Sequence, residues 1–421
     1  MRFLAHSNKD RDEMLSAIGV KTIDDLYSDV PNNIKSSFNL PDGLVEHKVF
    51  DFFKSLSNKN ISASDVDFFL GGGCYRHHIP ASVDHIIQRA EFLTSYTPYQ
   101  PEISQGTLAC IFEYQSLICE LTGMDVSNAS LYDGATALVE SVLMSKRIKK
   151  KDRVFIANKI NPDYLNVLQS YIGKVNISLD KDDLDNISAI ILQTPDFYGS
   201  PAIIDEYKKI CSEIGALLIV VNTEILAFGL IKPPKEADIV VGDAQSLGVG
   251  MNFGGPHLGY FACKKQYLRQ IPGRICGLTK DKDGQDGFVL TLNAREQHIR
   301  RAKATSNICS NQGLNMVAFT IHLALLGKSG FTKLAKLNHY RAQLLFKKIS
   351  SIKNINIINK SFFNEFVIEL PCNASIFLDK MLEKNIMAGI AISDNKVLVT
   401  VTELNNIDSI DNYVNNIKEI L

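Results

Sequence analysis

The chain has 421 residues, of which 45% are hydrophobic and 22% are charged, and its formal net charge at pH 7 is -1. These values are ordinary for a soluble globular protein and point to neither nucleic acid nor an anionic membrane surface as a partner. The length allows two or three domains with a large core.

Residues 1–65 are predicted to form a helical arm. The opening residues MRFLAHSNKD carry charges early and have no apolar run behind them, so we expect no signal peptide and a cytoplasmic location. Apolar spacing in RDEMLSAIGV predicts a helix that ends at Gly19, and Thr22 and Asp24 are start signals for another that stops at Pro31. An arm of this kind is expected to pack on another surface.

Residues 66–325 are predicted to form a large α/β domain. A glycine-rich loop from Phe68 to Val83 runs toward a helix, and a long helix is expected from about Gln105 to Thr122, ended by Gly123. Short apolar runs then alternate with helical patterns, and these runs are DRVFIAN, ISAIILQ, ALLIVVN, ADIVVGD and GYFACKK. Continuous apolar runs between helices indicate a parallel sheet that is buried on both faces.

Residues 326–421 are predicted to form a small α+β domain. The long helical pattern FTKLAKLNHYRAQLLFKKISS precedes two strand-like runs, NEFVIEL and KVLVTVTE, which are separated by a helix, and a final helix follows. The most apolar stretches of the chain, around 216–221 and 316–326, are shorter than the ~18 residues of a membrane span. We therefore expect no contact with a membrane.

The cysteines and the histidine pair give no metal signature. None of the cysteines forms a C-x-x-C pair, and they are predicted to be reduced thiols that pack as small hydrophobes. The eight are Cys74, Cys110, Cys119, Cys211, Cys263, Cys276, Cys309 and Cys372. His77 and His78 are adjacent, so their side chains point in different directions, and no third ligand stands at suitable spacing. They are expected to line a pocket or an interface.

Two glycine-containing segments invite a nucleotide or phosphate interpretation. The loop GVGMNFGGPHLG, from Gly248 to Gly259, does not fit G-x-G-x-x-G and is followed by a strand, so it is predicted to be a close-packed loop. The turn from Gly134 to Thr136 opens a helix whose amides could hold an anion. Asp133 beside this turn would repel a phosphate, so no phosphate site is expected there.

Long strings across nearly the whole chain resemble a known family. They are FLGGGCYRHHIP, EFLTSYTPYQPEISQGTL, NASLYDGATAL, GDAQSLGVGMNFGGPHLGYFA and LTLNAREQHIRRAKATSNICSNQ. The sequence is similar to the alpha subunits (subunit 1) of two-subunit glycine dehydrogenase, the P-protein of the glycine cleavage system. The resemblance implies the aspartate-aminotransferase-like fold (type I) of enzymes that depend on pyridoxal phosphate (PLP). Such a fold agrees with the large α/β domain and the small α+β domain.

The resemblance also indicates that this chain lacks two residues that bind PLP in the partner subunit. In the family's PLP-bearing subunit, a Schiff-base lysine follows the strand that corresponds to ADIVVGDAQ, and counting from Asp238 places Ser246 there. The carboxylate that faces the pyridine nitrogen corresponds to Asn222, with Glu224 a weaker alternative two residues later. A hydroxyl forms no imine, and an amide carries no charge to stabilise a pyridinium. We therefore expect neither catalytic residues of its own nor a PLP site.

The implied function is that of the subunit without PLP in a heteromer. With a PLP-bearing subunit 2, it would decarboxylate glycine, release CO2 and pass the aminomethyl group to the lipoyl group of H-protein, in a system that also includes T-protein and L-protein. The loops Gly71–His78 and Tyr96–Gln105 are expected to contribute to a shared interface site. The candidate side chains are Arg76, His77, His78, Tyr96, Tyr99 and Gln105. Two alternatives stay open: a self-sufficient PLP lyase or aminotransferase using another lysine, and a non-catalytic scaffold or regulatory protein.

Overall fold

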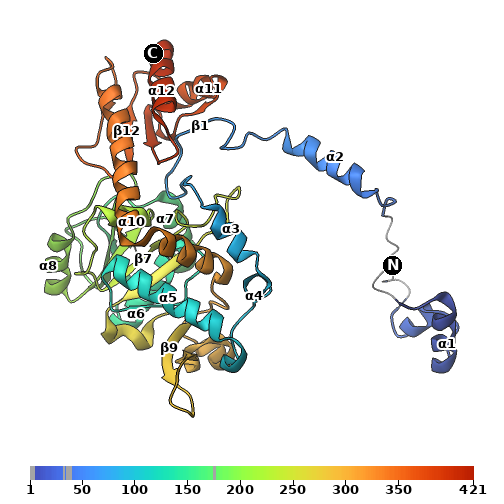
Figure 1. Cartoon of the computed structure of the whole chain (residues 1–421). Helices are drawn as coiled ribbons and strands as arrows, with labels where there is room; N and C mark the ends of the chain where they lie inside the picture. Colours follow the sequence, from blue (N-terminus) through green and yellow to red (C-terminus); the bar gives the residue numbers. More distant parts are fainter. Residues whose placement is uncertain (1–4, 32–33, 35–39, 174–176) are drawn as a thin grey trace. The chain divides into compact units, whose positions relative to one another are not determined.

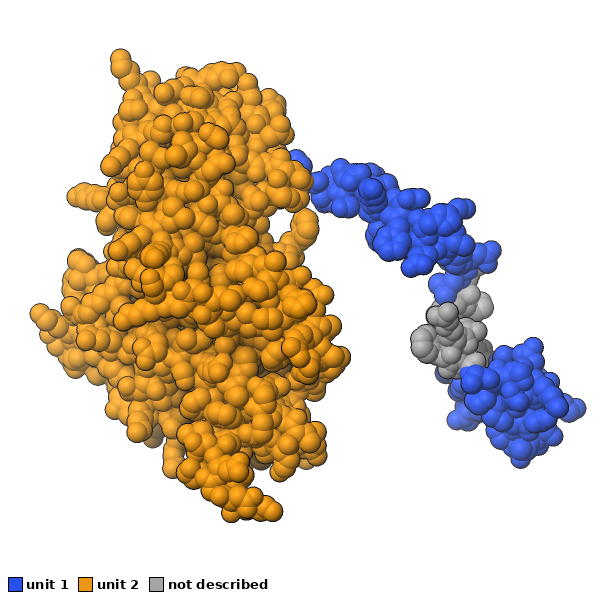
Figure 2. Space-filling view, viewed as in Figure 1, with its two compact units in different colours: residues 1–61 blue, residues 62–421 orange. Residues whose placement is uncertain are grey.

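The computed structural model describes residues 5–31, 34, 40–173 and 177–421. The chain divides into two compact units, residues 1–61 and residues 62–421 (Figure 2). The boundary lies close to residue 65, where the arm is predicted to end.

The described residues of the first unit form short helices, and none of them belongs to a hydrophobic core cluster. Its elements are α1 (Asn8–Ile18), η1 (Asp24–Tyr27) and α2 (Glu46–Ser57). Ser7 and Asp10 form a capping box at the start of α1, and Gly19 ends it in the left-handed conformation, as predicted. No residue of α1 or α2 is buried, although α2 carries Phe50, Phe52 and Phe53. These helices expose an apolar face that their own unit does not cover.

A seven-stranded sheet organises the second unit, in the order β2-β8-β7-β6-β5-β3-β4 (Figure 1). The strands are β2 (Val126–Ser127), β3 (Arg153–Ile156), β4 (Ile177–Ser178), β5 (Ile187–Gln193), β6 (Leu217–Asn222), β7 (Ile239–Asp243) and β8 (Gly259–Cys263). The five predicted strands are confirmed. The strands from β4 to β7 are parallel, whereas β8 is antiparallel to β7 and β2 is antiparallel to β8. The sheet is therefore parallel-rich rather than wholly parallel.

Helices cover both faces of this sheet, which explains its continuous apolar strands. Leu218 and Val220 of β6 belong to a core shared with α5, α8 and the start of α10, whereas Ile219 and Val221 face α6 and α7. Cys110, Cys211, Cys263 and Cys276 are buried in these cores as the sequence predicts. The helices are α5 (Gln105–Thr122), α6 (Gly134–Lys149), α7 (Pro162–Ile172), α8 (Ile204–Ile214) and α10 (Gly313–Ser350).

Smaller elements lie beside the seven-stranded sheet and the helices that cover it. An antiparallel hairpin of β9 and β10 packs against α5, and the sequence patterns did not indicate it because its strands are only partly buried. The elements concerned are α3 (Ala81–Ile87), α4 (Ala90–Leu93), η3 (Pro101–Ile103), β9 (Ile275–Lys280), β10 (Asp286–Thr291) and α9 (Gln297–Arg300).

The C-terminal region forms an antiparallel sheet in the order β11-β12-β15-β14, covered by helices. Its elements are β11 (Asn356–Ile357), β12 (Glu365–Glu369), α11 (Ala374–Glu383), β13 (Ile386–Met387), β14 (Ile390–Ser393), β15 (Lys396–Thr400) and α12 (Ile407–Ile420). The strands and helices expected here are confirmed. A strand ahead of the glycine-rich loop, β1 (Asp67–Phe68), pairs in parallel with β13. This pairing ties the start of the second unit to its last hundred residues.

Helix α10 joins the two layers. Its first half packs Met316 and Phe319 into the core of the large sheet, and its second half packs Leu345 into the C-terminal core. Gly327, with φ 57° and ψ 179°, breaks the helix close to the predicted domain boundary at 325/326. By length and hydropathy alone α10 could cross a membrane, so the expectation that every apolar stretch is too short was wrong for this helix. Its apolar side chains form the core instead.

Candidate functional site

A pocket of about 480 Å³ lies at the carboxyl ends of the parallel strands. This is the edge at which open α/β sheets bind ligands. Its wall includes the glycine-rich loop Gly71–Cys74, Asp133 before α6, Asn161 before α7, Asp243 at the end of β7, and His257. The Asn161 amide donates to the Gly72 carbonyl at 2.7 Å, which holds the loop over the sheet.

Carboxylates occupy the start of α6. Asp133 is the N-cap, and its Oδ1 accepts from the Thr136 amide at 2.7 Å. Asp243 Oδ2 accepts from the Gly134 amide at 3.1 Å. The amides that could otherwise hold an anion are thus engaged by two negative groups. Electrostatics at this helix start therefore disfavours a phosphate, in line with the prediction from Asp133.

The prediction of a close-packed loop from Gly248 to Gly259 holds only at its two ends, since Phe253 in the middle is 90% exposed and a Cβ atom on Gly254 would meet nothing within 4 Å. A Cβ atom on Gly248 would collide with the Ala318 carbonyl of α10, and Gly248 also has φ 87°. A Cβ atom on Gly259 would collide with the Asp133 backbone. The glycines at these two ends serve close approach of backbones rather than dinucleotide binding.

Ser246 follows β7 and is buried, and its Oγ has no hydrogen-bond partner among the described residues. Asn222 ends β6, and its amide is fully used within the chain. Its Nδ2 donates to the carbonyls of Thr194 at 2.9 Å and Glu224 at 3.0 Å, and its Oδ1 accepts from the Tyr260 hydroxyl at 3.2 Å. These two positions therefore offer neither an amine nor a free carboxylate to the pocket.

The His77 side chain is buried between the carboxylates of Glu224 and Glu403. Its Nε2 lies 3.1 Å from Glu224 Oε2 and its Nδ1 lies 2.8 Å from Glu403 Oε2. Burial by itself would lower the pKa of His77, but the carboxylates of Glu224 and Glu403 raise it to about 10. Glu403 also accepts from the His78 amide at 2.6 Å, and the His77 cation lowers the pKa of Glu403 to about 2 against the effect of burial. The His77 side chain is 2% exposed in this chain, and its place in a site shared with another subunit stays a prediction.

The sequence analysis missed a second buried connection at this loop. The Tyr75 hydroxyl donates to Glu365 Oε2 at 2.7 Å, while Glu365 Oε1 accepts from the Gly72 amide and the Thr400 hydroxyl, each at 2.7 Å. Burial raises the pKa of Glu365. A glutamate within the apolar run NEFVIEL was the available signal, since a buried carboxylate requires hydrogen-bond donors. Its partners lie too far away in sequence to be inferred from the run itself.

The other predicted side chains lie in different settings. Arg76 makes no hydrogen bond or ion pair with any described residue, and the His78 side chain is exposed. Tyr96 is 79% exposed, whereas the Tyr99 hydroxyl accepts from Arg274 at 3.3 Å and its ring faces the same guanidinium. Gln105 pairs with both the N–H and the carbonyl of Phe288 at 2.9 Å, so it anchors the start of α5 to β10. No hydrogen bond between described residues joins the two predicted loops.

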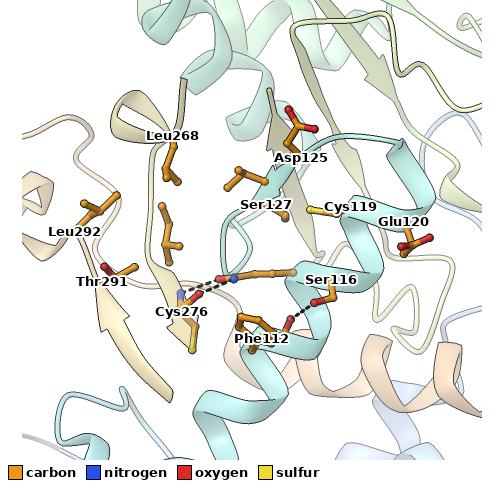
Figure 3. Close-up of a pocket in the computed structure, with 14 residues that line it drawn as sticks. Phe112, Ser116, Cys119, Glu120, Asp125, Ser127, Leu268, Cys276, Thr291 and Leu292 are labelled. Atoms are coloured by element: carbon orange, nitrogen blue, oxygen red, sulfur yellow. Dashed lines mark hydrogen bonds between the residues drawn. The ribbon is translucent and has the colours of Figure 1, made fainter. Parts of the chain in front are cut away.

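A second pocket, of about 550 Å³, lies between α5 and the β9–β10 hairpin (Figure 3). The Gln115 side chain bridges its floor by hydrogen bonds of 2.9 Å to the N–H and the carbonyl of Cys276. Burial raises the pKa of the Cys119 thiol to about 12 and of the Cys276 thiol to about 11, which keeps both thiols protonated. Among the described residues, no group of three histidine, cysteine or acidic side chains could hold a metal ion.

Comparison with known proteins identifies the family. A family model described as glycine cleavage system P-protein matches residues 1–417. The chain belongs to the glycine cleavage system P-protein family. This P-protein is 44% identical to the probable glycine dehydrogenase (decarboxylating) subunit 1 of Maricaulis maris, over 97% of this chain and 98% of the relative. It is also 44% identical to the same-named subunit of Parvibaculum lavamentivorans, over the full length of both.

Solved structures agree on the fold. A crystal structure of glycine decarboxylase (P-protein) of the glycine cleavage system, in inhibitor-bound form, superposes on this P-protein with a TM-score of 0.93 and 37% identity over both full lengths. Lactobacillus brevis glutamate decarboxylase superposes with a TM-score of 0.65 at 11% identity, over 91% of this chain and 94% of its own, and shows the fold alone. The predicted PLP-transferase fold of type I and the resemblance on which it rested are confirmed.

Proposed function

We propose that this chain is the subunit of a two-subunit P-protein that carries no PLP and that acts with a PLP-bearing subunit 2. One observation carries the proposal: Ser246, which cannot form an imine, stands after β7, where the resemblance places the Schiff-base lysine. Because none of the described residues that line the pocket at the sheet edge is a lysine, none of them can take over that role.

The rest of the pocket supports the same proposal. The Asn222 amide is neutral and is fully hydrogen-bonded inside the chain, so it offers no charge to a pyridinium. Glu224, the alternative, faces His77 and the Leu226 amide. Asp133 and Asp243 occupy the helix start where a phosphate would need unpaired amides. The residues present do not fit PLP, and we derive no chemical step through PLP in this chain.

The reaction proposed for the complete enzyme follows from the family. The two subunits together decarboxylate glycine, release CO2 and transfer the aminomethyl group to the lipoyl group of H-protein, in a cytoplasmic system that includes T-protein and L-protein. The PLP of the partner supplies an electron sink for the decarboxylation. That the relatives at 44% identity are named subunit 1 supports the existence of a second subunit.

Exposed apolar side chains support a large contact with another chain. Helices α1 and α2 bury none of their residues, and four large side chains between Leu93 and Ile103 are more than half exposed. These are Leu93, Tyr96, Tyr99 and Ile103. Apolar surface of this extent on a water-soluble chain marks an interaction site. The Arg76 guanidinium, which pairs with no described residue, offers paired donors for a carboxylate of substrate or partner.

The first test is reconstitution. The purified chain, mixed with PLP, glycine and lipoylated H-protein, is expected to show no exchange of glycine carboxyl carbon with bicarbonate until subunit 2 is added. It is also expected to stay without an internal-aldimine absorbance band in the visible range. Decarboxylation by this chain alone would contradict the proposal and would favour a self-sufficient PLP enzyme.

The second test asks whether this chain contributes side chains to the shared site. In the reconstituted complex, Arg76→Ala and Tyr96→Phe are each expected to lower turnover about tenfold or more. The reason is that each variant loses one charge-assisted or transition-state hydrogen bond. Arg89→Ala and Tyr171→Phe are matched controls, because Arg89 pairs only with exposed Glu91 and Tyr171 is exposed on α7. Normal assembly with unchanged turnover in the first two variants would favour a scaffold role.

A further inference from the structure

Three side chains of the pocket at the sheet edge form a cluster that the proposed function does not use. Cys74 ends the glycine-rich loop, Asp243 ends β7, and His257 lies in the loop that leads to β8. All three line the same pocket of about 480 Å³. A thiol, an imidazole and a carboxylate in contact are the components of an activated cysteine nucleophile.

The carboxylate of this cluster is held firmly. Asp243 Oδ1 accepts from the Gln245 amide at 2.9 Å, and its Oδ2 accepts from the Gly134 amide at 3.1 Å. The same Oδ2 lies 3.1 Å from His257 Nδ1. The Asp243 side chain is 2% exposed, so little water competes for these contacts. Asp243 therefore fixes both the orientation and the charge of the imidazole ring.

The imidazole connects this carboxylate to the thiol. His257 is within hydrogen-bonding reach of both the Asp243 carboxylate and the Cys74 sulfur, and these two contacts raise the pKa of His257 to about 10. The ring is therefore an imidazolium at neutral pH. Its backbone is held as well, since the Asn315 amide donates to the His257 carbonyl at 3.0 Å. Reactive cysteines generally lie in partly exposed, electropositive surroundings, and His257 supplies a positive charge in this pocket.

Cys74 differs from the buried cysteines of the chain. Burial raises the pKa of Cys110, Cys211 and Cys263 to between about 11 and about 12, and these thiols pack in the apolar cores. Cys74 is partly exposed at a pocket instead. Cys309 is exposed and does not line this pocket, which makes it a matched control for simple accessibility.

We propose that Cys74 is a reactive thiol which captures small disulfide-containing molecules in this pocket as mixed disulfides. The Cys74 thiolate attacks one sulfur of R–S–S–R, the S–S bond of that molecule breaks, and a Cys74–S–S–R bond forms. The second sulfur leaves as RS⁻, which takes a proton from solvent. Cys74 is oxidised and the leaving sulfur is reduced, so the disulfide is itself the oxidant.

The charge of the pocket selects among disulfides. In the part of the chain that the structure describes, Asp133, Asp163 and Asp243 line the pocket, His257 is its one cation, and no lysine or arginine belongs to the lining. The surplus of negative charge attracts a cationic disulfide and repels an anionic one, and salt screens both effects. The site is therefore expected to prefer disulfides that carry amines.

The experiment uses the full-length chain without subunit 2, so its result does not depend on which subunit binds PLP. Cystamine and 3,3′-dithiodipropionate, which are of similar size and opposite charge, are reacted at neutral pH, and mass spectrometry follows each cysteine over time. Cys74 is expected to react with cystamine about tenfold faster than Cys309, because Cys74 lies in a pocket with the His257 imidazolium and three aspartates, and Cys309 does not line that pocket. The preference for cystamine over the dianion is also expected to be about tenfold at Cys74 and to shrink at about 0.5 M salt.

Variants separate activation from accessibility. His257→Asn is expected to lower the rate at Cys74 about tenfold and to leave the rate at Cys309 unchanged, because it removes the cation beside the thiol. His257→Gln serves as a second variant if the first unfolds, and Cys309→Ser leaves the Cys74 rate intact. The proposal is overturned if Cys74 reacts no faster than Cys309, or if both histidine variants fold and react at the wild-type rate. Equal rates with the two disulfides would also overturn the selection by charge.

Discussion

His77 and His257 are both held by carboxylates, and the pKa of each is raised to about 10. His77 lies between two carboxylates with 2% of its side chain exposed, whereas His257 has one carboxylate and 18% of its side chain exposed at a pocket. The first imidazolium joins the glycine-rich loop to β6 and to the segment after β15. The second has a free edge that faces a thiol.

The comparison shows that a similar pKa does not imply a similar role. Two carboxylates that accept from both ring nitrogens use every donor of His77, so its charge is available only for stability. One carboxylate leaves the second ring nitrogen of His257 for another group. His77 therefore serves structure, because two carboxylates use both of its ring nitrogens. His257 has one carboxylate partner and lies at a pocket, so its ring is available for chemistry.

The largest expected effect follows removal of the buried cation. His77→Gln leaves Glu224 and Glu403 buried without a positive partner, which typically costs about 3–5 kcal/mol. Urea unfolding followed by circular dichroism would measure the loss. Glu91→Gln is the control, because its pair with Arg89 is exposed and screened by solvent and therefore contributes little to stability. If the free energy of unfolding fell no more in His77→Gln than in this control, the contacts of His77 with Glu224 and Glu403 would not be important for stability.

High pH should weaken the ion pairs of His77 with Glu224 and Glu403. The pKa of His77 rises from 6.5 in the unfolded chain to about 10 in the folded one, so its stabilisation is complete below pH 6.5 and is lost as the pH rises through about 10. The melting temperature of the wild-type chain should fall across this interval. The fall should be shallower in His77→Gln, which has no imidazole to titrate. Parallel curves for the two proteins would contradict the assignment.

An intermediate effect is expected at the second histidine. Asp243→Asn keeps the shape of the side chain but removes its charge, so the pKa of His257 should drop from about 10 toward 6.5. NMR titration of labelled histidine would detect this change, and the resonance of His77 should not move. Because His257 is only partly buried, the loss of stability should be smaller than in His77→Gln.

The smallest effect concerns Ser246, which is buried after β7. Ser246→Ala removes a buried hydroxyl that has no partner among the described residues, and should raise the free energy of unfolding by up to about 1 kcal/mol. Ser145→Ala is the matched control, since that buried hydroxyl donates to Val142 and contacts Ser188, and its loss should cost about 1 kcal/mol. Destabilisation by Ser246→Ala would reveal a use for Ser246 that the structure does not show.

The sequence by itself determined the elements and the missing amine. Apolar runs between helical patterns predicted five strands of the large sheet, and Gly19 and Gly123 marked helix ends, because burial and left-handed backbone leave local traces. Ser246 was identified through the resemblance to the family's PLP-bearing subunit, by counting from Asp238 in a recognisable strand. The pairing of β1 with β13 and the partly exposed β9–β10 hairpin left no comparable pattern.

Only the tertiary structure decided which side chains meet. Glu403 lies 326 residues from His77, and Cys74, Asp243 and His257 come from three separate segments. Of the predicted interface residues, it placed His77 in the core and engaged Gln105 with β10, while it left Arg76 and Tyr96 uncommitted. Local patterns report burial and backbone preference, whereas contacts between distant residues depend on strand order and loop packing. That dependence is why the absence of a lysine at Ser246 could be inferred from the sequence, whereas the cluster of Cys74, Asp243 and His257 could not.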